Sequence, residues 1–342
     1  GAAAASAGLM IDLRYVLFMV LVYVTARYIV GARRQLLIGA GIGAGIVIGF
    51  AGLQVLLLPD DILGNIGYTK QTISPYLTVD MNHDYVRINS TLRGPNPVGA
   101  YAAMCLALVL AFITQRRDRL TRNEALVTGL LAAGSISALW ASYSRSAVVA
   151  GVGMVLLVAA LSQIKRVPRK WWIAGAMVLL GVIGGIIAAR DTAFVSNIIL
   201  HENPDGGSVT KSNDGHVDSL RDGTARMLVQ PLGGGIGSTG SASLRSDEPL
   251  IIENQYLFIA HEVGWLGLGL FMALFGLVLW RLWLRRDDWL ALGVLASGLG
   301  LAAIGILLPV WVDDTVAIIW WGLAGLAIGV TRRTHGKRRT RH

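Results

Sequence analysis

Long apolar stretches separated by polar connections dominate the chain. Leucine, isoleucine, valine, alanine and glycine fill these stretches, with few charged residues among them. A helix of about 20 apolar residues is long enough to cross the hydrocarbon core of a bilayer. The pattern therefore predicts nine membrane spans, at about 11–30, 36–58, 98–114, 124–142, 147–163, 171–189, 252–280, 288–308 and 316–330.

The composition agrees with a membrane protein. Hydrophobic residues make up 54% of the chain and charged residues only 15%, against about 25% charged in ordinary soluble domains. Too few polar residues are present to cover a water-facing surface, which argues against a soluble enzyme. The predicted fold class is all-α: one polytopic transmembrane helix bundle over 1–330, with a basic tail at 331–342.

The net charge of +9 could indicate binding to nucleic acid, but its distribution indicates membrane topology. Lysine and arginine concentrate in alternate connections and in the tail, whereas acidic residues concentrate in the other connections. This is the bias that places basic loops on the cytoplasmic side. We therefore expect a cytoplasmic C-terminus, an N-terminus outside, and no nucleic-acid partner. With an odd number of spans, no initiator methionine and no signal peptide, we also expect helices to be missing upstream.

Two long loops, at 59–97 and 190–251, are predicted on the outer face, and loops of this length tend to carry function. Within the second, residues 215–229 place apolar residues at helical spacing among charges, which predicts an amphipathic helix lying on the membrane. A glycine-rich run at 231–240 follows. Its backbone N–H groups, including those of Gly234 and Gly235, could shape a pocket or bind a phosphate oxygen.

Isolated arginines at the ends of spans are the candidate ligands for a negatively charged substrate. An arginine carries a permanently charged fork that matches phosphate oxygens, so several around one outer pocket would suit a lipid-linked diphosphate. The alternative is that such side chains reach toward the interface or pair with nearby acids. Arg145 favours function most, because it lies in a tight turn between two spans. The other candidates are Arg87, Arg93 and Arg221.

The seventh span begins with polar residues that could do acid–base chemistry. Glu253, at the helix start, is placed to exchange a proton with a substrate on the solvent side; the alternative is a carboxylate favoured there by the helix dipole and by capping. Asn254 and His261 share one face, with His261 about 10 Å deeper. His216, in the second long loop, is a reserve base, or else an ordinary surface histidine. No spacing of histidine and cysteine predicts a metal site.

These features occur in an order that resembles the bacterial O-antigen ligase/polymerase superfamily, membrane enzymes that handle undecaprenyl-diphosphate-linked glycans. The resemblance covers about residues 12–330 and rests on the order, spacing and sidedness of several motifs. The motifs are Arg87 with Gly94-Pro-Asn96-Pro before the third span, Ser144-Arg145-Ser146, Gly215-His216, Ser219-Leu-Arg221 with the glycine-rich run, and Glu253-Asn254 followed after nine residues by Gly264 and after two more by Gly267.

The resemblance implies a metal-independent, cofactor-free inverting glycosyltransferase of the bacterial plasma membrane, with its active site outside. The donor would be a polyprenyl-diphosphate-linked glycan, and the acceptor a glycan or a lipid. Arg145 and Arg221, with Arg87 or Arg93, would hold the diphosphate. Asn96 belongs to a matching motif, and Asn254 would orient a sugar or carboxylate.

One departure from the family pattern affects the expected reaction. Family ligases carry a histidine, thought to act as the base, where this chain has Glu253. Loss of that histidine favours a polymerase, which lengthens a lipid-linked chain, over a ligase, which transfers the finished glycan. Two rivals remain, a secondary transporter and an inactive assembly protein. A transporter would place its site near mid-membrane between paired repeats, and no convincing internal repeat is present.

Overall fold

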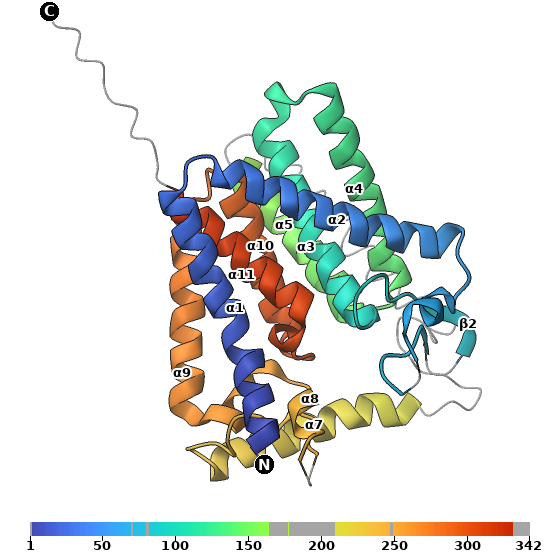
Figure 1. The fold of residues 1–342 in the computed structure, drawn as a ribbon, viewed down its shortest axis with the longest axis vertical. Coiled ribbons are helices and arrows are strands. Elements are labelled where there is room, and N and C mark those ends of the chain that lie inside the picture. Colours follow the sequence, from blue (N-terminus) through green and yellow to red (C-terminus); the bar gives the residue numbers. More distant parts are fainter. Residues whose placement is uncertain are drawn as a thin grey trace, which may run out of the picture.

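In the computed structural model, residues 2–69, 71–79, 82–163, 177, 209–246 and 249–330 are described. Most of them form helices (Figure 1). The α-helices are α1 (Ala2–Tyr28), α2 (Ala32–Leu56), α3 (Pro95–Arg116), α4 (Arg122–Ala141), α5 (Arg145–Gln163), α7 (Val209–Val229), α8 (Gly240–Ser243), α9 (Gln255–Trp283), α10 (Trp289–Ile304) and α11 (Asp314–Gly329). Short 3-10 helices are η1 (Ile62–Ile66), η2 (Arg117–Arg119) and η4 (Val310–Val312).

Helices occupy eight of the nine predicted spans. Six of them, α1 to α5 and α9, are long and apolar enough to cross a membrane, and α10 and α11 are shorter apolar helices of 16 residues each. The predicted span 171–189 lies outside the described residues apart from residue 177. The chain is thus an all-α membrane bundle, as the sequence predicted, and the count of nine spans stays a prediction.

The centre of the bundle is formed by α3, α10 and α11, whose inner faces are apolar and almost free of solvent contact. Alanines of α3 are fully buried, and Gly293 of α10 lies so close to α3 that an added Cβ would approach the Cα of Leu108 to 2.9 Å. Small residues allow such close approach of helix backbones. Trp320 and Trp321 of α11 are fully buried and pack edge to face, with ring centroids 5.0 Å apart.

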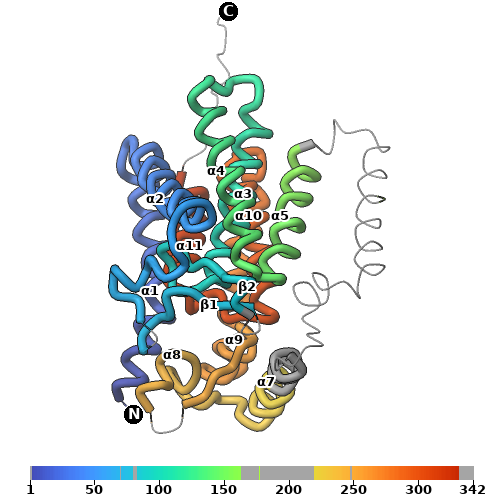
Figure 2. Tube along the Cα trace, turned by 90° about the vertical axis from the view of Figure 1, so that its right-hand side faces the viewer, coloured from blue at the N-terminus to red at the C-terminus, as the bar shows by residue number. Residues whose placement is uncertain are grey.

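One end of the bundle carries the described parts of the two long loops, 59–97 and 190–251, and we call it the loop end. Figure 2 shows β1, β2, α7 and α8 toward this end, together with the N-terminus. The strands β1 (Leu77–Val79) and β2 (Asn82–Arg87) form an antiparallel hairpin, which the sequence did not predict. The hairpin ends at Arg87, eight residues before the start of α3, and so fixes where Arg87 lies.

The amphipathic helix of the second long loop begins at Val209, six residues earlier than predicted. Its residues Leu220 and Met227 pack against a buried cluster that includes Leu257 and Phe258 of α9. Part of the apolar face that was predicted to contact the membrane is therefore used to hold α7 against α9.

A kink divides α9 at Gly264, where φ is 69° and ψ is −173°. This left-handed conformation costs glycine little and other residues much. Residues 255–263 therefore form a short first segment, and residues 265–283 form the long second one. His261 lies in the short first segment, before the kink, and its depth relative to Asn254 stays a prediction.

Candidate functional site

A cavity of about 970 Å³ lies where the hairpin, the turn between α4 and α5, α7 and α10 meet. Its polar lining gathers at the loop end, and the rest of its wall is apolar. None of the described residues that line it is acidic. The polar lining consists of Arg87, Asn96, Tyr143, Ser144, Arg145 and Ser146. Arg87, Asn96 and Arg145, which the sequence singled out in two separate connections, thus line one cavity.

Arg87, at the end of β2, is held in place by two neighbouring elements. Its Nη2 donates to Oδ1 of Asn96 at 2.7 Å, and its Nε donates to the carbonyl oxygen of Ser142 at 2.9 Å. Asn96 lies in the first turn of α3, and Ser142 ends α4. The guanidinium is half-buried and oriented before any ligand arrives.

Arg145 is the first residue of α5, so its positive charge adds to that of the helix N-terminus. Ser144 precedes it and is buried, with its N–H donating to Oγ of Ser142 at 3.2 Å. The N-terminus of a helix, where the first N–H groups lack partners within the helix, attracts anions. The start of α5 and Arg87 therefore create a positive region at the polar end of the cavity.

The backbone between α4 and α5 turns sharply at Tyr143, whose φ is 48°. For a residue other than glycine this left-handed conformation costs about 1 kcal/mol. The half-buried ring of Tyr143 lines the cavity and packs edge to face on Tyr85 of β2, with centroids 6.2 Å apart. Burial, with a smaller contribution from Tyr85, raises the pKa of the Tyr143 hydroxyl, which therefore stays protonated at neutral pH.

The apolar wall of the cavity follows one stripe on α5 and one on α10. The α5 stripe runs from Val149 to Leu157, and the α10 stripe from Ala296 to Ala303. From Arg145 to Leu157 the helix rises by about 18 Å. The cavity thus joins a positive polar end to a long hydrophobic wall, which suits an anionic head group on a hydrocarbon chain.

Glu253 lies next to this cavity. It lines a hollow of about 10 Å³ together with Leu220 and Leu307, and these two residues also line the large cavity. Its backbone N–H donates to Oγ of Ser219 at 3.4 Å. Glu253 is not the helix cap, because the N-cap of α9 is Asn254, but it still lies at the positive end of the helix dipole.

Asn254 is engaged in holding the fold. Its Oδ1 accepts hydrogen bonds from the N–H groups of Tyr256 and Leu257, at 2.9 and 3.0 Å, and its Nδ2 donates to the carbonyl oxygen of Ile306 at 2.7 Å. These bonds cap α9 and tie it to the end of α10. Asn254 therefore has a structural role, and its contact with a sugar stays a prediction.

The glycine-rich run forms hydrogen bonds with the backbone on both sides of the kink in α9. The N–H groups of Gly234 and Gly235 donate to the carbonyl oxygens of His261 and Glu262, and the N–H of Trp265 donates to the carbonyl oxygen of Pro231 at 3.0 Å. Broken helix ends need such partners for their backbone groups. The N–H groups of Gly234 and Gly235 thus stabilise the kink, and these hydrogen bonds already use the donors that were predicted to bind a phosphate oxygen.

His261 is buried behind the same run. Its imidazole lies so close to Gly234 that an added Cβ there would come within 3.0 Å of the ring. It does not line the large cavity. Arg221 is exposed on α7 beside the cavity residue Leu220, and the backbone of His216 lies in the same helix.

Arg93 lines a second cavity of about 190 Å³, which shares Asn96 and Leu308 with the first. The same cavity contains Asp313, a buried carboxyl that caps α11 by accepting from the N–H of Val316 at 3.0 Å. Burial raises the pKa of Asp313 above its usual range, and the Val316 bond and the charge of Arg93 partly oppose that rise. No group of three histidine, cysteine, aspartate or glutamate residues within the described part of the chain could hold a metal ion.

Sequence reasoning missed Tyr143 and Asp313. Tyr143 adjoins the Ser144-Arg145-Ser146 motif, but nothing in the sequence shows that its backbone is left-handed. Asp313 lies in an acidic pair just before an apolar span, which is a signal for a helix cap. Such a signal could have found Asp313.

Comparisons with known proteins add no relative. A scan against protein-family models and a search of curated proteins each give no match to this chain.

Proposed function

We propose that this protein is a membrane glycosyltransferase that lengthens a surface polysaccharide from polyprenyl-diphosphate-linked repeat units. One observation carries the proposal: Arg87 and Arg145, from separate connections, meet at the polar end of a cavity whose remaining wall is apolar. A polyprenyl diphosphate has the same two parts, an anionic head and a long hydrocarbon chain.

In the proposed complex, the guanidinium groups of Arg87 and Arg145 hold the diphosphate, and the polyprenyl chain follows the stripes on α5 and α10. Both arginines face the place where negative charge grows as the diphosphate departs. Preorganised positive groups at such a position are a main source of catalysis. Arg93, which lines the neighbouring cavity that shares Asn96 with the first, would contact the acceptor glycan or the diphosphate that carries the acceptor. We place Arg221 at the rim.

Glu253 is the proposed base. It accepts the proton of an acceptor hydroxyl while that oxygen attacks the anomeric carbon of the donor sugar. The bond between that carbon and the diphosphate oxygen breaks, and its electron pair leaves with the polyprenyl diphosphate. One displacement inverts the anomeric centre, and the cleaved bond supplies the energy. His216 is the reserve base.

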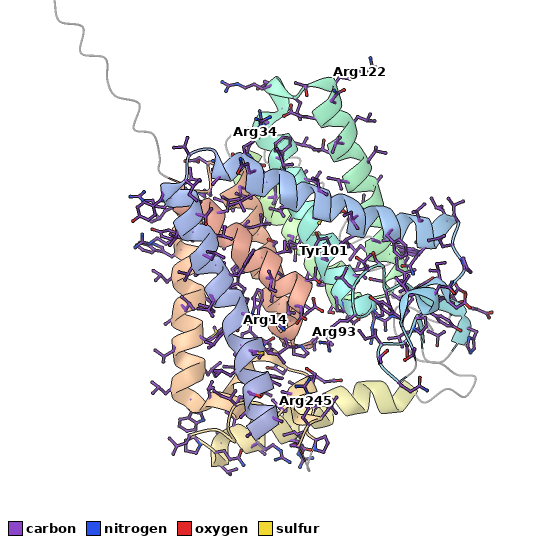
Figure 3. The ribbon with its side chains drawn as sticks, viewed as in Figure 1. Arg14, Arg34, Arg93, Tyr101, Arg122 and Arg245 are labelled. Atoms are coloured by element: carbon purple, nitrogen blue, oxygen red, sulfur yellow. The ribbon has the colours of Figure 1, made fainter. Side chains whose placement is uncertain are left out.

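We place the loop end of the bundle outside the cell, in the bacterial plasma membrane, with the C-terminus in the cytoplasm. The concentration of lysine and arginine in the connections at the opposite end supports this orientation. In Figure 3, Arg34 and Arg122, from connections rich in basic residues, lie toward one end, and Arg93 and Arg245 lie toward the other. Basic residues concentrate on the cytoplasmic side of membrane proteins.

Polymerisation is preferred to ligation because Glu253 stands where family ligases carry histidine. The two reactions share the donor and differ in the acceptor, so the same cavity would serve either. Their products differ, which makes the choice testable in cells.

Binding of the lipid head group tests the proposal directly. Purified wild-type protein should bind undecaprenyl diphosphate, and Arg145→Ala should weaken that binding by about tenfold or more, since a charge-assisted contact is lost. Arg245→Ala removes an exposed arginine at the same end, outside the cavity, and should bind like wild type. Equal affinities of all three proteins would contradict the proposal.

A further inference from the structure

Tyr143 has a left-handed backbone conformation, and nothing in its backbone contacts requires a tyrosine at this position. It follows the end of α4, the position where helices commonly place a left-handed residue, and glycine is the usual choice there. Its backbone N–H donates to the carbonyl oxygen of Trp140 at 3.0 Å, a bond that a glycine would make equally well. The backbone therefore gives no reason for a tyrosine.

Ser90 provides a comparison. It is the other non-glycine residue with positive φ among the described residues, and its φ is also 48°. Ser90 has a local reason for being there. Its side-chain Oγ donates to the carbonyl oxygen of Val47 at 2.7 Å in the interior, and its N–H donates to Oε1 of Gln54 at the same distance. At Tyr143 the side chain instead lines the large cavity.

The surroundings of the ring suit a sugar. Tyr143 lies two residues before Arg145, and Tyr85, on the same strand as Arg87, packs edge to face against it. The face of an aromatic ring carries partial negative charge and attracts the C–H groups on the face of a pyranose. The Tyr143 hydroxyl, which stays protonated, can also exchange hydrogen bonds with sugar hydroxyls.

We infer that Tyr143, supported by Tyr85, is the platform for the sugar that is bonded directly to the diphosphate. The inference rests on the proposed function, since it needs the diphosphate at Arg87 and Arg145. With the diphosphate there, the next group of the donor is that sugar, and among the described residues that line the cavity Tyr143 is the aromatic one. Tyr143 is then a binding residue that distinguishes a glycosylated carrier from a bare one.

Two ligands separate this role from diphosphate binding. One is undecaprenyl diphosphate alone, and the other is the same lipid carrying the repeat unit of the strain, extracted from cells that lack the gene. Tyr143→Gly suits the backbone and removes the ring. It should lower affinity for the glycosylated lipid by about tenfold and leave affinity for the bare lipid within about twofold. Tyr143→Phe keeps the ring and should retain most of the preference.

Ser90→Gly is the matched control, because Ser90 has the same positive φ as Tyr143 but lies outside the cavity. It should leave the ratio of the two affinities unchanged. An unchanged ratio in Tyr143→Gly, or an equal loss for both lipids, would overturn the inference. Failure of the proposed function looks different: wild-type protein would bind neither lipid, or Arg145→Ala would bind both as well as wild type does.

Discussion

Arg87 and Asn96 form a hydrogen bond of 2.7 Å that joins the end of β2 to the first turn of α3. Both residues line the large cavity, so the bond sets the direction of the guanidinium at its polar end. A second bond, to the carbonyl oxygen of Ser142, ties the same group to the end of α4. A group held in this way loses little freedom when it binds a ligand.

Changing Asn96 should therefore alter binding through Arg87. In Asn96→Asp a carboxylate would pair with the guanidinium and offset its charge, because opposite charges at this distance attract strongly. We expect affinity for undecaprenyl diphosphate to fall by about tenfold, while the protein stays folded. Direct binding in detergent measures the change. Asn65→Asp, at an exposed position of η1, is the control, and equal affinities of the two variants would argue against the role of Arg87.

Glu253→Gln should separate chemistry from binding. The amide cannot take up a proton, so the rate of glycan transfer should fall by about 100-fold or more. Affinity for the donor lipid should change little, since Arg87 and Arg145 remain. Transfer rates at saturating donor give the first quantity, and equilibrium binding gives the second. Asp61→Asn changes an exposed carboxyl and should leave both unchanged; full activity in Glu253→Gln would exclude Glu253 as the base.

Gly264→Ala should destabilise the protein. An added Cβ at Gly264 would collide with the carbonyl oxygen of Pro231, and the left-handed φ of 69° disfavours alanine. Together these effects should lower the free energy of unfolding by about 1–3 kcal/mol. Thermal unfolding in detergent measures it. Gly49→Ala places a methyl group in open space on α2 and should unfold like wild type, so equal midpoints for both variants would disprove the packing at the kink.

The buried carboxyl of Asp313 should make stability depend on pH. Its pKa in the folded state lies above the usual value of 3.8, so the folded state keeps this proton to higher pH than the unfolded state does. Asp313 therefore contributes less to stability as the pH rises through its folded-state pKa. Asparagine caps a helix as well as aspartate does, so Asp313→Asn should gain stability relative to wild type from about pH 4 upward. A constant difference in unfolding midpoint across pH would contradict this.

The membrane spans could be predicted from the sequence because their signal is local. Each helix from α1 to α5 carries enough apolar residues to be recognised by length and hydropathy alone. The hairpin was missed because β2 contains Asn82, His83 and Asp84, and two of these residue types, asparagine and aspartate, are depleted in strands. Its pairing with β1 depends on contacts that periodicity does not show.

The candidate site could be predicted only in part. Arg87 and Arg145 were found because an isolated arginine beside an apolar span is unusual. The role of the glycine-rich run was not found, because its N–H groups bond to the carbonyl oxygens of His261 and Glu262 only once α9 bends at Gly264. Tyr143 was missed for a related reason, since a left-handed tyrosine is visible only in three dimensions.

The most direct test of the central claim is the size distribution of lipid-linked glycan in a strain that lacks this gene, compared with strains that carry the wild-type gene or Arg145→Ala. Polymerisation at the Arg87–Arg145 cavity predicts single repeat units on the lipid carrier in the deletion strain and in Arg145→Ala, and long chains when the wild-type gene is restored. Full-length chains stranded on the carrier would indicate a ligase instead. An unchanged profile in the deletion strain would contradict glycan transfer altogether.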